Sequence, residues 1–164
     1  MPIEFKKTYL LLGSNLGNKE VLLESAVKQI EKLIGAIFAK SAIYETAAWG
    51  KIDQPSFLNL AIGVDTLLTP LELLNNILGI EENLGRIRAE KWGARLIDID
   101  VILYGDEIIN LGQQLIIPHV EMQNRKFVLQ PLAEIAPNIK HPILNKTIIE
   151  LLNHLNDSLP VVKR

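Results

Sequence analysis

Residues 93–105 read GARLIDIDVILYG and contain the strand that completes the predicted core of the fold. The β-prone residues predict a strand from about residue 96 to 104, yet Asp98 and Asp100 interrupt it. Aspartate is depleted in strands because its short side chain competes for backbone hydrogen bonds. Side chains alternate along a strand, so both carboxylates are expected on one face, about 7 Å apart. The opposite face is expected to hold Ile97, Ile99, Val101 and Leu103.

Outward from this strand, the hydrophobic pattern predicts the element order β-α-β-β-α-β. Strands are expected at residues 8–12, 37–46, 57–66 and 96–104, and helices at residues 19–34 and 69–84. Thr69 and Glu72 make a capping box at the start of the second helix, and Gly35 is positioned to end the first. This order is the split βαβ pattern of ferredoxin-like domains, which carry both helices on one sheet face and leave the other for a ligand.

The rest of the chain adds smaller elements to this core. A hairpin-like piece is expected at Ile108 and residues 115–117, followed by helices near residues 127–135 and 147–155. No internal repeat, low-complexity tract or linker is found. The prediction is therefore an α+β fold (an α/β sandwich) with a ferredoxin-like βαββαβ core and a C-terminal helical extension, in one domain over residues 1–164.

Composition excludes several functional classes. The formal net charge of −2 argues against a nucleic-acid-binding protein, because phosphate backbones require a basic surface. The sequence has no cysteine, so it has neither disulfides nor thiolate zinc sites. No apolar run reaches the roughly 20 residues of a membrane span, and the first residues lack a secretory pattern. A cytoplasmic protein is expected.

The two aspartates have a structural and a chemical interpretation. In the first, each forms a salt bridge with a cation such as Lys91 or Arg95 at the sheet edge. In the second, they bind magnesium, which takes oxygen ligands and commonly joins carboxylates to substrate phosphates. The basic loop just before the strand favours the second, because cations beside a metal site can hold the remaining phosphate oxygens. Its cations are Arg86, Arg88, Lys91 and Arg95.

Other residues carry weaker signals. Glu81 continues the apolar stripe of the second helix, where an ion pair with an arginine is the simpler role. Residues 13–20, GSNLGNKE, lack the ending of a phosphate-binding loop and fit a helix-capping turn better. Taken by itself, His119 is interpreted as a structural histidine. Phe57 and Asn59 share a strand face and together suit a planar heterocycle, although Phe57 also fits a core position.

Six stretches together closely resemble the 6-hydroxymethyl-7,8-dihydropterin pyrophosphokinase family. They are LLGSNLGNKE, YETAAWG with DQPSFLNLAI, EENLGRIR, KWGARLIDIDVILYG and IPHVEMQNRKFVLQPLAEIAP, which cover nearly the whole chain. The resemblance implies an enzyme of folate biosynthesis that transfers the β,γ-diphosphate of ATP to the pterin's hydroxymethyl group and releases AMP. It also implies two Mg²⁺ ions, with ATP as co-substrate, and a monomer.

The resemblance further implies roles for individual residues. Asp98 and Asp100 would be the metal ligands and, with Arg86 and Arg95, the catalytic residues. The residues implied for ATP are Arg86, Arg88, Trp92, Arg95, Ile99, Val101, His119 and Arg125. Those implied for the pterin are Thr46, Ala48, Trp49, Phe57, Asn59, Trp92 and Phe127, with Phe57 and Phe127 sandwiching its ring. Among the departures from the family, Gln114, Ile116 and Val120 stand where some members place Arg, Thr and Tyr near the nucleotide.

Two other functions fit the same residues. One is an ordinary kinase or nucleotidyltransferase that uses the same metal pair. The other is a ferredoxin-like binding or regulatory module in which the acidic pair is structural. The products formed from ATP, magnesium and the hydroxymethyl-dihydropterin would separate the three.

Overall fold

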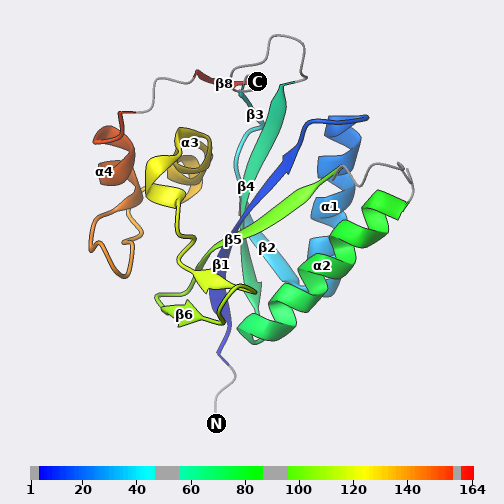
Figure 1. Cartoon of the computed structure of the whole chain (residues 1–164), viewed down its shortest axis with the longest axis horizontal. Coiled ribbons are helices and arrows are strands. Elements are labelled where there is room, and N and C mark those ends of the chain that lie inside the picture. The colour runs from blue at the N-terminus through cyan, green and yellow to red at the C-terminus, as the bar shows by residue number, and fades with distance from the viewer. Residues whose placement is uncertain (1–3, 47–55, 87–95, 157–159) are drawn as a thin grey trace.

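A computed structural model describes residues 4–46, 56–86, 96–156 and 160–164 of the chain, and a central antiparallel sheet organises them (Figure 1). Its strands are β1 (Lys6–Ser14), β2 (Gly35–Lys40), β3 (Tyr44–Thr46), β4 (Phe57–Thr66), β5 (Asp98–Tyr104) and β8 (Val161–Lys163). The order across the sheet is β5-β1-β4-β3-β8, and β2 also pairs with β4. A separate two-stranded sheet joins β6 (Ile109–Asn110) to β7 (Ile116–Ile117).

The helices pack on the two faces of this sheet. They are α1 (Lys19–Leu33), α2 (Pro70–Arg86), α3 (Lys126–Ile135) and α4 (Ile148–Asn153), with a 3₁₀ turn, η1, at Met122–Asn124. At α2 the predicted capping box forms: Thr69 N–H donates to Glu72 Oε1 at 2.9 Å, and Glu72 N–H donates to Thr69 Oγ1 at 3.2 Å. At α1 the Asn18 side chain accepts from Val21 N–H. None of the helices in the described ranges is long and apolar enough to cross a membrane.

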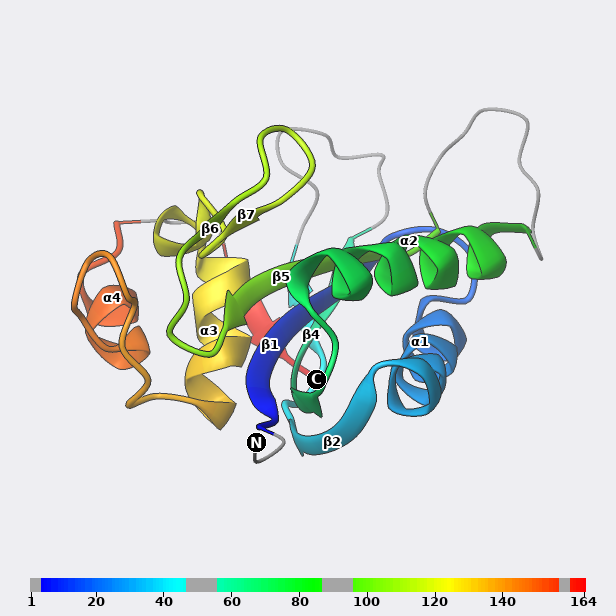
Figure 2. The ribbon, with the colours of Figure 1, turned by 90° about the horizontal axis from the view of Figure 1, so that it is seen from below.

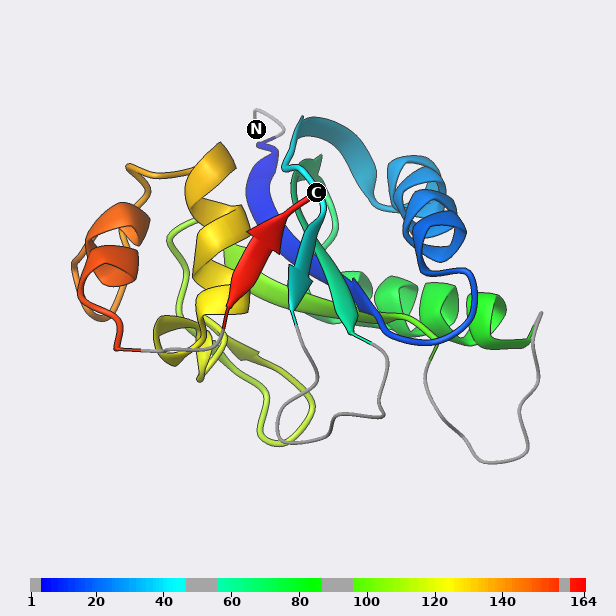
Figure 3. The ribbon, with the colours of Figure 1, turned by 90° about the horizontal axis from the view of Figure 1, so that it is seen from above.

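The sheet separates two hydrophobic cores (Figures 2 and 3). On one face, Leu10, Leu12 and Ile99 pack with residues of α1 and α2. On the other, Tyr9, Leu11 and neighbours pack with residues of α3 and α4. This alternation of Leu10, Leu11 and Leu12 is the period-two pattern of a strand with both faces buried. The second face is therefore partly covered, not wholly open to a ligand.

Two details of the predicted strands are wrong. The strand expected over residues 37–46 is two strands, β2 and β3, which pair with different parts of β4. Between them, Ser41 bonds to the backbone of Ala61 in both directions, at 2.9 Å each. In β5, the register against β1 shifts so that Tyr9 opposes Leu103 while Leu10 opposes Val101. This bulge puts Leu103 in the α3 core rather than with Ile99 and Val101.

Gly35 directly follows the Ile34 C-cap of α1, which is the predicted C′ position, and a second constraint also requires glycine there. It is the first residue of β2, and a Cβ there would lie 1.9 Å from the Asp65 carbonyl oxygen. Glycine is required at this position because the backbones of β2 and β4 approach too closely for a side chain.

Candidate active site

Asp98 and Asp100 lie at the start of β5 on the sheet face opposite α1 and α2. Ile99, between them, belongs to the core beneath those helices, as the alternation predicts. Asp98 is half-buried and Asp100 is exposed. Both side chains are thus placed at the end of the sheet where the chain enters β5, beside the surface that α3 only partly covers.

A row of directly opposed residues connects the aspartates to Asn59. Asp98 pairs with Gly13 of β1, and Gly13 pairs with Asn59 of β4. Opposed residues in an antiparallel sheet share a face, so Asp98 and Asn59 stand two strand spacings apart, about 10 Å, on the same side. A Cβ on Gly13 would lie 2.8 Å from Asn59 Oδ1. Because Gly13 has no side chain, the Asn59 amide has room to lie over β1, on the side toward Asp98.

Thr46 and Phe57 continue this surface beyond Asn59. Thr46 of β3 opposes Phe57 of β4, and Phe57 lies two residues before Asn59, so all three share one face. Thr46 is only 3% exposed and Asn59 only 5%. The Thr46 hydroxyl is buried and has no hydrogen-bond partner among the described residues. A buried polar atom in this state is costly unless some other group satisfies it.

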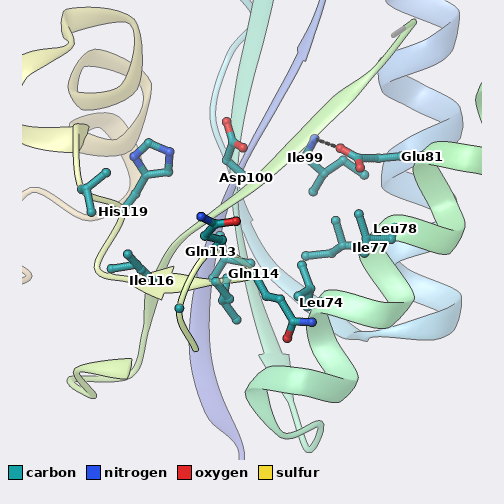
Figure 4. Close-up of a pocket in the computed structure, with 14 residues that line it drawn as sticks. Leu74, Ile77, Leu78, Glu81, Ile99, Asp100, Gln113, Gln114, Ile116 and His119 are labelled. Atoms are coloured by element: carbon teal, nitrogen blue, oxygen red, sulfur yellow. Dashed lines mark hydrogen bonds between the residues drawn. The ribbon is translucent and has the colours of Figure 1, made fainter. Parts of the chain in front are cut away.

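A pocket of about 510 Å³ opens along the outer edge of β5 (Figure 4). Its apolar wall comes from α2 and β5, and its polar wall from the segment that contains β7. The lining comprises Leu74, Ile77, Leu78, Glu81, Ile99, Asp100, Val101, Gly112, Gln113, Gln114, Leu115, Ile116, His119 and Val120. One apolar wall and a few convergent polar groups are typical of a small-molecule site.

Asp100 and His119 lie near one another at one end of this pocket (Figure 4). The Nδ1 atom of His119 accepts the Glu121 N–H at 3.2 Å, so Nε2 is the nitrogen available to donate. The His119 N–H donates to the Ile102 carbonyl at 3.1 Å, which fixes this segment against β5. His119 is therefore held by its neighbours and also faces the pocket.

Arg125 and Phe127 mark the start of α3. Arg125 is the N-cap residue, and its guanidinium carbon lies 5.8 Å from the centre of the Phe127 ring. Phe127 is half-buried and packs against the core under α3 and α4. Arg125 is exposed. The pair thus places a cation beside an aromatic ring that also packs against the core.

Glu81 has a clear structural role. Its Oε2 accepts the Ile99 N–H at 2.7 Å and so joins α2 to the outer edge of β5 (Figure 4). The expected ion pair with an arginine stays a prediction, since the arginine side chains of the basic loop lie outside the described part of the chain. The backbone contact could not be read from the sequence, because it depends on how α2 crosses β5.

Several predicted site residues fall outside the described ranges. They are Ala48, Trp49, Arg88, Lys91, Trp92 and Arg95. Arg86 is the last residue of α2, and its side chain is likewise outside the description. The residues that the structure does bring to one end of the sheet are Thr46, Phe57, Asn59, Asp98, Ile99, Asp100, Val101, His119, Arg125 and Phe127.

Tyr44 was not predicted to have a role at the site. It opposes Asn59 across β3 and β4, and its hydroxyl donates to Glu134 Oε1 of α3 at 2.6 Å. Burial and this bond to a carboxylate raise the pKa of Tyr44 to about 12. The same carboxylate accepts the Ala42 N–H at 3.2 Å. Tyr44 therefore attaches β3 to α3, across 90 residues of sequence.

The donor set suits magnesium better than a metal that needs a complete protein cage. Across the described residues, no group of three His, Asp or Glu side chains could hold a metal ion. Magnesium binds through one or two carboxylates and takes its remaining oxygens from water and substrate phosphates. Asp98 and Asp100, which share a face beside a pocket, fit that requirement.

Comparison with known proteins gives a consistent result. The model of the 7,8-dihydro-6-hydroxymethylpterin-pyrophosphokinase (HPPK) family matches residues 9–137. A 2-amino-4-hydroxy-6-hydroxymethyldihydropteridine pyrophosphokinase of Methylorubrum extorquens is 44% identical over 153 residues, covering 93% of this chain and 95% of the relative. The Aquifex aeolicus protein of the same name is 42% identical over 142 residues, covering 87% of this chain and 88% of the relative.

Among solved structures, the HPPK-DHPS of Plasmodium falciparum has a similar fold. A triple mutant of that protein aligns with a TM-score of 0.77 at 23% identity. The alignment covers 92% of this chain but only 44% of the Plasmodium chain, so the likeness concerns one part of that longer protein.

Proposed function

The chain belongs to the 7,8-dihydro-6-hydroxymethylpterin-pyrophosphokinase family, and on that premise we propose its reaction and the residues that perform it. The enzyme transfers the β,γ-diphosphate of ATP to the hydroxymethyl oxygen of 6-hydroxymethyl-7,8-dihydropterin, giving the pterin diphosphate and AMP in folate biosynthesis. The observation that carries this proposal is the position of the aspartate pair. Asp100 lines the pocket, and Asp98 begins the row that leads to Asn59.

ATP is assigned to the pocket along β5. The apolar wall from α2 and β5 suits a nucleoside, and His119 Nε2 at the Asp100 end suits a phosphate oxygen. Ile99 N–H faces outward toward Glu81, so by alternation the backbone groups of Val101 also face the outer edge. Arg125, and Arg86, Arg88, Trp92 and Arg95 from the family resemblance, complete the proposed ATP site.

The pterin is assigned to the surface beyond Asp98. Asn59 supplies amide donors and an acceptor, and the buried Thr46 hydroxyl is a polar atom that a ligand would satisfy. Phe57 and Phe127 are both half-buried, one on the sheet and one at the start of α3, which leaves ring surface to stack on a heterocycle. Ala48, Trp49 and Trp92 join this site on the resemblance alone.

Asp98 and Asp100 would hold two Mg²⁺ ions together with the ATP phosphates. When bound, the ions supply positive charge that stabilises the attacking and leaving oxygens of an in-line displacement. The chain's own part is to orient the substrates: Asn59 and the phenylalanines fix the pterin, and the pocket fixes the nucleotide. Such positioning is the main protein contribution to phosphoryl transfer.

The remaining assignments concern the whole chain. We propose that residues 1–164 form one domain with a ferredoxin-like βαββαβ core and a C-terminal helical extension. The strand order β5-β1-β4-β3 and the position of α1 and α2 on one face support this. A monomer that acts in the cytoplasm on small molecules, without nucleic acid or membrane, is part of the same proposal.

Analysis of the nucleotide product tests the function. The purified protein is incubated with ATP, magnesium and 6-hydroxymethyl-7,8-dihydropterin, and the nucleotides are separated by chromatography. AMP formed in equal amount to pterin diphosphate is the expected result. ADP would show an ordinary kinase instead, and no pterin-dependent turnover would leave only a binding module.

A further inference from the structure

β8 forms the edge of the described sheet beside the proposed pterin site (Figure 3). It pairs antiparallel with β3, and Val161 opposes Thr46 while Lys163 opposes Tyr44. The pairing continues beyond the strand, because the Arg164 N–H donates to the Ile43 carbonyl at 2.9 Å. This contact joins residues more than 100 positions apart in the sequence, and β8 lies outside the 9–137 range that the family model matches, whereas β3 lies inside it.

β3 is held by its two neighbouring strands and by the hydrogen bond from Tyr44 to Glu134 of α3. It is three residues long, and its partner on the inner side is the first part of β4. Thr46, its last residue, carries the buried hydroxyl in the proposed pterin site. The position of this hydroxyl relative to Asn59 and Phe57 therefore depends on how firmly β3 is held from both sides.

Side chains at the end of β8 strengthen the attachment. Arg164 forms ion pairs with Glu20 of α1 at 3.2 Å and with Glu45 of β3 at 4.0 Å. Lys163 lies 3.9 Å from Glu134, the residue that accepts the Tyr44 hydroxyl. These pairs are partly exposed and individually weak. Their arrangement nevertheless ties the end of β8 to α1, β3 and α3 at once.

We propose that β8 is a positioning element for pterin binding, which holds β3 in the conformation that receives the substrate. The inference rests on the pterin site assigned above. When only a fraction of molecules is binding-competent, the apparent dissociation constant rises in inverse proportion to that fraction. Loosening β8 should therefore raise the KM for pterin. It should leave kcat and the KM for ATP unchanged, because the ATP pocket lies on β5 at the opposite edge.

Alternation along β8 provides a matched set of variants. Because the Arg164 N–H bonds to β3, the Val162 N–H also faces β3, while the Val161 N–H faces the outer side. Val162→Pro removes a donor from the pairing, and Val161→Pro removes only an outward donor. Val162→Ala shortens the same side chain, which is 59% exposed, and keeps the donor.

Steady-state kinetics and calorimetric pterin binding with the full chain test the inference. Val162→Pro is expected to raise the pterin KM and Kd about 3- to 10-fold, the usual effect of one lost hydrogen bond. Val162→Ala and Val161→Pro should stay within twofold of the original protein. A merely structural role would instead lower the Tm or the active fraction while the pterin KM stayed constant.

Two outcomes separate this inference from the proposed function. If Val162→Pro folds and keeps the original pterin KM, or if Val161→Pro raises that KM equally, β8 does not position the site. Phe57→Ala tests the underlying assignment independently, and an unchanged pterin KM in that variant would show that the pterin binds elsewhere.

Discussion

Asp98 and Asp100 have the same chemistry but different surroundings. Asp98 is half-buried and stands in the row that leads through Gly13 to Asn59. Asp100 is exposed, opposes Leu11 and lines the pocket along β5. Because alternate side chains of a strand lie on one face, the two carboxylates can bind the same group of metal ions from these different positions. Their charge, rather than their size, should matter for the reaction.

Asp98→Asn and Asp100→Asn test the role of charge, since asparagine keeps the shape and removes the anion. Each is expected to lower kcat for AMP formation by about 10²-fold or more, the scale for losing a charge-stabilising group. The thermal midpoint should change little. Asp106→Asn, in the exposed turn after β5, makes the same substitution away from the site and should keep full activity. Near-normal turnover in either site variant would refute the metal assignment.

The elements of the fold were predictable to different degrees. The start of α2 was predicted to the residue, because Thr69 and Glu72 form their capping box from local sequence alone. The division of residues 35–46 into β2 and β3 was not predictable, because it depends on where each pairs with β4. For the same reason, the position of Gly13 opposite Asn59 follows from strand register rather than from any motif.

Gly13→Ala should disturb the Asn59 amide. The new Cβ would lie 2.8 Å from Asn59 Oδ1, which is too close, so the flexible amide must move. The pterin KM is expected to rise about 3- to 10-fold, as for a lost hydrogen bond, with little change in the KM for ATP. Gly79→Ala is the control, because a Cβ there meets nothing within 4 Å and alanine favours the helix. An unchanged pterin KM in folded Gly13→Ala would exclude Asn59 as a pterin ligand.

At the scale of the whole molecule, Tyr44 joins two parts of the fold. It lies on β3, and its hydroxyl donates to Glu134, an exposed residue near the end of α3. Burial and the Glu134 carboxylate raise its pKa to about 12 in the folded protein, above the ordinary value near 10. A protonated Tyr44 therefore stabilises the native state fully below pH 10, and this contribution is lost as the pH rises toward 12.

Tyr44→Phe isolates that contribution. At pH 8 the variant is expected to unfold with a free energy about 1–3 kcal/mol lower than the original protein, as for a hydrogen bond to a charged group. The difference should shrink between pH 10 and about 12. Urea denaturation at a series of pH values measures this difference. The contributions of Tyr9 and Tyr104, whose pKa values are also raised, cancel because both proteins contain them. A difference that stays constant up to pH 11.5 would contradict the Tyr44–Glu134 coupling.

The sequence by itself determined the element types, the helix caps, the shared face of Asp98 and Asp100 and the family resemblance. These depend on local periodicity and on motifs of neighbouring residues. Only the tertiary structure decided the bulge that moves Leu103, the close approach at Gly35, the contact of Glu81 with Ile99 and the pairing of β8 with β3. Each of these joins residues far apart in the chain, and strand register and helix packing are set by the whole core rather than by any one segment.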